Sequence, residues 1–254
     1  MPVSMSTSAP PRLAGLWERV RAGRGPLTRT LRRAGSTALG TYAAYVAHGL
    51  LHPTMLRSHA TAAERAEALP GDELLAAPDW VTDFAIDVAA PPAAVWPWLV
   101  QLGWGRAGWY TWYPLDNGGV ASAAELVPAL QTLAVGDIIP DGPRAAEGFG
   151  VWRVHALEPD HALVLRSRRD LLDGRELAAG DPDTRRAVDC SWVFALREVA
   201  PGRTRVRVRV RAHFLGATSL AVVARAMRVL FGLGDNVMEN SLLEGLRARA
   251  ERVR

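Results

Sequence analysis

The sequence predicts an α+β domain in which an antiparallel sheet packs one face on a long C-terminal helix. Three observations support this fold class. Residues 205–211 alternate strictly between polar and apolar side chains, and at 83–88 large apolar residues alternate with Asp83, Ala85 and Asp87; both patterns have the period of a strand. Short apolar segments joined by turn residues dominate after Val135. From Ala217 to the end the apolar period becomes helical. Strands followed by one long helix are typical of a sheet that buries its apolar face against that helix.

The first strand and helix follow directly from spacing. Phe84, Ile86 and Val88 share one face, and their neighbours form a second face that we expect to be in water. Pro91-Pro92 suits the first turn of a helix, where missing amide hydrogens do no harm. Apolar residues then recur helically from 95 to 102, and Gly103 is a natural terminator.

The later strands form hairpins. Residues 151–157 and 162–167 flank the turn Pro159-Asp160, and a strand around 190–196 reaches 205–211 through Pro201-Gly202. In this last strand we expect the valines inside and the arginines in water. Gly232 and Gly234 in the C-terminal helix leave two interpretations. Either the helix breaks and Asp235 caps a second piece, or the glycines allow a close approach.

Composition and length limit the organisation of the chain. It has 254 residues, 49% hydrophobic and 22% charged, which excludes a wholly disordered protein. No uncharged apolar run reaches the ~18–20 residues of a confident spanning helix, which excludes a polytopic membrane protein. We expect a basic, partly disordered helical extension at 1–56. A short helix with a capping box at Thr61–Glu64 and a linker follow at 57–78, and the main domain spans 79–254.

The basic charge lies in the extension. Residues 1–33 hold seven arginines and one acid, so they carry +6, and the other residues sum to −2. A basic tail on a nearly neutral body argues against nucleic acid as a partner. Residues 12–51 combine a basic helical pattern with a weak apolar segment, which fits either a membrane-surface helix or a helix packed on the domain. The single cysteine favours a reducing compartment, so the expected location is cytoplasmic, with membrane association through the extension as the alternative.

Several familiar chemistries find little support. Residues 103–108 match the spacing of a dinucleotide-binding loop, but an aromatic segment follows instead of a helix. His48 and His52 have helical metal-ligand spacing without a third ligand. Cys190 lies on an apolar strand face, as an inert buried thiol would. We therefore expect neither a cofactor nor a metal.

The aromatic segment is the least ordinary feature. Seven large rings lie within eighteen residues: Trp96, Trp98, Trp104, Trp109, Tyr110, Trp112 and Tyr113. Such a cluster suits either core packing or the wall of an apolar pocket. Arg106, Asp116 and Asn117 lie beside these rings, where they could orient the polar end of a ligand or form a local turn and salt bridge.

These residues resemble a known family. The segments Ala-Val-Trp-Pro-Trp-Leu-Val-Gln-Leu-Gly at 94–103 and Gly-Arg-Ala-Gly-Trp-Tyr at 105–110 look like an uncharacterised branch of the SRPBCC superfamily. This START/Bet v 1-like group includes polyketide cyclases/dehydrases and lipid-transfer proteins. Weaker matches are at 69–74, 133–137 and 237–251, so the resemblance spans most of residues 60–252. Trp104 and residues 114–117 depart from the usual pattern.

The resemblance implies a helix-grip fold, with the sheet wrapped around the terminal helix and a deep apolar cavity between them. It implies no catalytic residues. We expect the protein to bind a hydrophobic small molecule or lipid in this cavity. The same cavity would also suit transport of that molecule. The pocket-lining residues would be Trp96, Leu99, Trp109, Tyr110, Trp112, Trp152, Trp192, Phe194, Met227, Phe231 and Met238.

Two alternatives stay open. The first is a cyclase or dehydratase in the same cavity, with Tyr110, Asp116 or His155 as acid or base. The second is an accessory protein tethered to a membrane surface by its basic extension.

Overall fold

The computed structural model describes residues 57–111, 117–170, 174–178, 181, 187–215 and 221–252, with the backbone alone for 221–234. The chain divides into two compact units, Met1–Thr41 and Tyr42–Arg254, and every described residue belongs to the second. The extension at 1–56, with its alternative interpretations and its histidine pair, lies outside the described residues. No helix in the described ranges is long and apolar enough to cross a bilayer.

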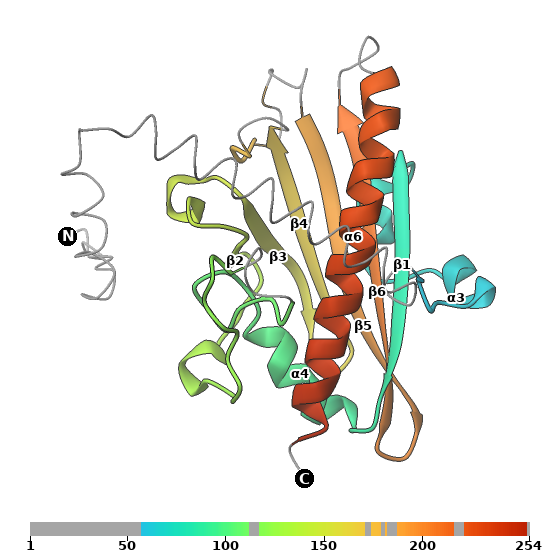
Figure 1. The fold of residues 1–254 in the computed structure, drawn as a ribbon, viewed down its shortest axis with the longest axis vertical. Coiled ribbons are helices and arrows are strands. Elements are labelled where there is room, and N and C mark those ends of the chain that lie inside the picture. The colour runs from blue at the N-terminus through green and yellow to red at the C-terminus, as the bar shows by residue number, and fades with distance from the viewer. Residues whose placement is uncertain are drawn as a thin grey trace, which may run out of the picture. The chain divides into compact units, whose positions relative to one another are not determined.

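Six antiparallel strands form one open sheet in the order β1-β6-β5-β4-β3-β2 (Figure 1). Helix α6 (Ala221–Ala250) lies over one face of this sheet, and it contacts β1 and the shorter helix α4 (Pro92–Val100). The predicted α+β class, with an antiparallel sheet and a terminal helix, is confirmed. The strands are β1 (Trp80–Val88), β2 (Ile138–Pro140), β3 (Val151–Glu158), β4 (Ala162–Asp170), β5 (Ala187–Ala200) and β6 (Arg203–Leu215).

The face of the sheet toward α6, here called the inner face, carries the core. Phe84, Val208, Phe194 and Leu163 lie in register across four neighbouring strands, and all four are buried. Full burial of each such side chain stabilises the fold by about 1.5–3 kcal/mol. Alternation places every second residue of a strand on this face, so the β6 valines point inward as predicted.

The predicted turns and caps are also present. Asp160 between β3 and β4 and Gly202 between β5 and β6 both adopt positive φ, 61° and 69°. Thr61 caps α3 (Ala62–Ala66), since its Oγ1 accepts from the Glu64 amide at 3.1 Å and Glu64 Oε2 accepts from the Thr61 amide at 2.8 Å. Three short 3-10 turns complete the described elements: η2 (Asp72–Leu75), η3 (Pro128–Leu130) and η4 (Ala145–Glu147).

Helix α6 runs unbroken through Gly232 and Gly234. Asp235 lies inside the helix, so the interpretation that it caps a second piece is wrong. A close approach exists further along, at Gly245, where a Cβ atom would overlap the carbonyl oxygen of Tyr110. Tyr110 has a φ of 61°, and this glycine lets its strained backbone lie directly against the helix.

Residues 57–76, here called the strap, cover part of the other face of the sheet, the outer face. The Ser58 carbonyl accepts from the Ala85 amide at 3.0 Å, which attaches the strap to the edge strand β1. Leu69 packs on Val164 and Val193 of the outer face. Gly71 follows with a φ of 85°, and a Cβ there would overlap the Val164 side chain. The strap is therefore packed closely on the sheet.

The strap overturns the expectation that the β6 arginines lie in water. Arg207 and Arg209 are only 5% and 3% exposed. On β1, where we expected a wet face, Asp83 and Ala85 are also buried. Alternation showed correctly which residues share a face, but it contains no information about what covers that face.

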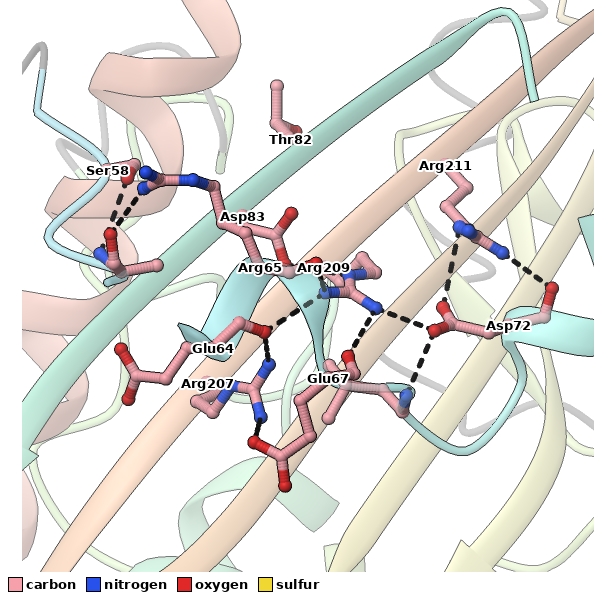
Figure 2. Close-up of polar contacts among 12 residues, drawn as sticks. Ser58, Glu64, Arg65, Glu67, Asp72, Thr82, Asp83, Arg207, Arg209 and Arg211 are labelled. Carbon is pink, nitrogen blue, oxygen red and sulfur yellow. Dashed lines mark hydrogen bonds and ion pairs between the residues drawn. The ribbon is translucent and has the colours of Figure 1, made fainter. Parts of the chain in front are cut away.

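Acidic and carbonyl groups of the strap, together with Asp83 of β1, bind these arginines (Figure 2). Arg209 donates from Nε to Asp83 at 2.7 Å, from Nη1 to Asp72 at 2.6 Å and from Nη2 to the Arg65 carbonyl at 2.9 Å. Arg207 donates to the Glu67 carboxylate at 2.7 Å. Its other nitrogen reaches the Glu64 carbonyl. Every guanidinium in this row is thus neutralised or hydrogen-bonded, which is what makes its burial tolerable.

Candidate functional site

Indole rings gather on the inner face, where the sequence predicts a pocket wall. Trp109 stacks on Trp192 with ring centroids 5.2 Å apart. Trp152 also lies 5.2 Å from Trp192, and Phe194 lies 4.9 Å from it. The loop after α4 supplies Trp109, β3 supplies Trp152, and β5 supplies the other two. These four predicted residues therefore meet, and we call them the aromatic wall.

Two of these indoles carry polar atoms without protein partners. The N–H groups of Trp152 and Trp192 are buried, and neither finds an acceptor among the described residues. Buried polar groups in proteins are nearly always hydrogen-bonded to protein, water or ligand, because an orphaned one costs about 1–3 kcal/mol. The indole N–H of Trp98 is in the same condition, but it lies on α4, edge-on to Tyr110.

The other predicted lining residues are only partly placed. Trp96 and Leu99 on α4 are buried in the same core as the aromatic wall, and Met238 on α6 is half-buried. Trp112 and Asp116 lie outside the described residues, as do the side chains of Met227 and Phe231.

The remaining predicted polar residues are bound to main-chain carbonyls. Arg106 donates from Nε to Leu102 at 2.8 Å and from Nη2 to Val100 at 2.8 Å, which satisfies carbonyls at the end of α4. Asn117 donates to the Val120 carbonyl at 2.7 Å, within a local turn. Both contacts are structural.

Tyr110 joins α4 to α6. Its hydroxyl donates to the Trp98 carbonyl at 2.9 Å and accepts from Gln101 at 3.0 Å, and the Arg249 guanidinium lies 4.4 Å from its ring centroid. Burial raises the pKa of Tyr110, so the phenol stays protonated. Of the other acid–base candidates, His155 is exposed on β3, and Asp116 is outside the described residues.

Two carboxyl groups of α6 form a polar centre that sequence reasoning missed. Thr82, on the inner face of β1, donates to Asp235 Oδ2 at 2.8 Å. Figure 2 shows Thr82 pointing away from Asp83, to the opposite side of the strand. Glu239 lies one helical turn after Asp235 and is 4% exposed, and its Oε2 has no hydrogen-bond partner in the described part of the chain. We call Asp235 and Glu239 the acid pair.

Burial dominates the electrostatics of this pair. It raises the pKa of Asp235 to about 7, partly opposed by the hydrogen bond from Thr82. The pKa of Glu239 lies well above its ordinary value, first because of burial and second because of the charge on Asp235. A sequence signal did exist: Asp235 and Glu239 continue toward the N-terminus the helical stripe that carries Leu242 and Leu246.

Cys190 and Arg169 border the same region. Cys190 is two residues from Trp192 on β5, and burial raises the pKa of its thiol to about 12, with Asp235 adding to the effect. Arg169 donates to Asp141 at 2.6 Å, so its charge is already compensated, and it lies 5.0 Å from the Trp152 ring centroid. In the described residues, no group of three or more His, Cys, Asp and Glu side chains could hold a metal ion.

These features define the class of protein as α+β, with an open six-stranded antiparallel sheet and a C-terminal helix over its inner face. No protein-family model matches the chain, and no curated protein matches it.

Some solved structures are distantly similar. Protein MLL2253 from Mesorhizobium loti is 17% identical over 69% of this chain and 99% of that chain, with a TM-score of 0.37. CalU16 from Micromonospora echinospora is 13% identical over 68% and 84%, with a TM-score of 0.29. Hypothetical protein jhp0584 from Helicobacter pylori is 17% identical over 71% and 94%, with a TM-score of 0.40. Because these TM-scores are low, we assign the fold class from the sheet and the helix of this protein alone.

Proposed function

We propose that this protein binds a small hydrophobic molecule with a polar end, between the inner face of the sheet and α6. One observation carries the proposal. Three buried polar atoms of this region, the indole nitrogens of Trp152 and Trp192 and Oε2 of Glu239, have no hydrogen-bond partner among the described residues.

The size of the resulting penalty favours a bound partner. Three orphaned groups at about 1–3 kcal/mol each would cost roughly 3–9 kcal/mol. The whole stability of a domain is about 5–15 kcal/mol. A ligand or internal water that pairs with these groups removes the penalty, and the aromatic wall offers apolar area for the rest of a ligand.

The state of Asp235 and Cys190 gives a second argument. Both keep accessible surface, yet the surrounding protein desolvates both strongly enough to raise their pKa. Groups that line an enclosed space combine these two properties, because a probe reaches them there while bulk water does not.

The test uses the full chain and prodan, a neutral, polarity-sensitive naphthyl ketone. We expect saturable binding, a blue-shifted emission and energy transfer from tryptophan. Trp192→Phe keeps a large ring but removes the indole N–H that would donate to the ketone, so it should weaken binding by about fivefold, equivalent to roughly 1 kcal/mol.

Trp98→Phe is the matched control, because it removes an equally orphaned N–H from α4. It should leave prodan affinity unchanged. Absence of saturable binding, together with no apolar compound retained by the purified protein in native mass spectrometry, would overturn the proposal. An equal loss in both variants would also contradict it, because the probe would not be resting on the aromatic wall.

A further inference from the structure

We propose that the polar end of the ligand is a protonated amine, held by the carboxyl groups of Asp235 and Glu239. This inference deepens the proposed function and rests on it. It names the charge and hydrogen-bonding character of the molecule that the inner face would accept.

The geometry of the acid pair comes from helical spacing. Residues four apart on a helix lie one above the other on the same side, so the two carboxyl groups are neighbours on α6. Thr82 binds one oxygen of Asp235. Oε2 of Glu239, which has no hydrogen-bond partner among the described residues, is left as an acceptor on the same side of the helix.

No cation of the described protein serves this pair. Among the residues whose side chains are described, the groups that interact with it are the hydroxyl of Thr82 and the titratable thiol of Cys190, both on the sheet, besides the two acids themselves. None of the described arginines or histidines forms an ion pair with Asp235 or Glu239. Arg169, which acts electrostatically on Cys190, is itself bound to Asp141 at 2.6 Å.

Two neighbouring carboxylates that the protein desolvates are unstable without a counter-ion. They must take up a proton or bind a cation, because an isolated carboxylate in a poorly solvated site is costly. An ammonium group has three donors and one positive charge, so it can serve both acids at once. A hydroxyl has one donor and no charge, and a carboxylate would be repelled.

A head-group series on one alkyl chain tests this directly. Dodecylamine, dodecanol and dodecanoate have equal chain lengths, and each would compete with prodan on the full-length protein below its micelle concentration. At pH 8 we expect the amine to bind about tenfold more tightly than the alcohol, with the carboxylate weakest. Tightening of amine binding between pH 6 and pH 8 is expected, because Asp235, with a pKa of about 7, loses its proton over that interval.

Substitutions of the two acids test whether the preference for the amine depends on the acid pair. Glu239→Gln and Asp235→Asn should each lower amine affinity by about tenfold, flatten its pH dependence and leave dodecanol affinity within about twofold. The control is Glu244→Gln on the same helix, because Glu244 is exposed and should change none of these values. Circular dichroism and thermal unfolding identify any variant that fails to fold.

The outcomes separate the two proposals. If prodan and all three alkyl compounds fail to bind, the proposed function is wrong and this inference falls with it. If dodecanol or dodecanoate binds as tightly as dodecylamine, or if both variants keep full amine affinity, the inner face binds hydrophobic molecules but the assignment of an amine is wrong.

Discussion

Replacing Arg209 by methionine should destabilise the protein by about 3–5 kcal/mol, the usual cost of removing one partner from a buried ion pair. Arg209 is 3% exposed and lies between Asp83 and Asp72, with Nε and Nη1 donating at 2.7 and 2.6 Å. Methionine keeps an apolar stem, so packing changes little. The loss comes from Asp83, which is itself buried and would be left without its cationic partner.

Urea unfolding measures this difference, and thermal unfolding gives a second reading. For a protein of this size each kcal/mol shifts Tm by about 2–4 °C, so we expect Tm to fall by about 6–20 °C. The control is Arg203→Met. Arg203 pairs with Asp87 at 2.9 Å, but the two side chains are 56% and 40% exposed, so its loss should cost less than about 1 kcal/mol.

Equal stabilities of the Arg209 and Arg203 variants would refute the reasoning. A double variant, Arg209→Met with Asp83→Asn, adds an independent check. Removing the unpaired charge should recover part of the stability, so the two substitutions should be clearly non-additive.

Three further predictions concern single titratable groups. Hydrogen bonds from Arg205 lower the pKa of Glu64 to about 2, so its contribution to stability is full above about pH 4.5 and is lost as the pH falls toward 2. Glu64→Gln should therefore flatten the acid limb of stability measured by urea unfolding between these values, and an unchanged limb would contradict this. Thr82→Val removes a hydrogen bond that favours the ionised form of Asp235, so the pKa should rise above about 7 in a carbon-13 NMR titration rather than fall. With a pKa of about 12, Cys190 should react with a disulfide reagent at pH 8 at least about a hundredfold more slowly in the folded protein than in urea, and comparable rates would show an accessible thiolate.

Local periodicity predicted the elements and the inner face. The valines of β6 and the alternating residues of β1 give a period of two, and that period alone assigns them to faces. This period could not predict whether water or another part of the protein covers the outer face. The partner of Arg207 is Glu67, which is 140 positions away in the chain. A local sequence pattern cannot predict a charge pair between residues so far apart in the sequence.

The aromatic part of the candidate site could be predicted from the sequence, because it depends on the residue type alone. Trp109 and Trp192 were expected as pocket residues because large rings are rarely left in water, and they do stack. The acid pair was missed because acids on a helix usually lie on its solvated side. Only the continuation of the apolar stripe through Asp235 and Glu239 argues otherwise, and the nearby glycines left a broken helix at that point as one of two interpretations.

The packed strap has a practical consequence for the choice of expression boundaries. A shortened gene that starts at the first strand, near residue 79, would express a sheet stripped of one covering layer. The hydrophobic patch at Val164 and Val193 would face the medium, Arg207 would lose Glu67, and Arg209 would keep Asp83 but lose Asp72. Such a fragment should aggregate, whereas one that begins ahead of Arg57 keeps the strap over this patch.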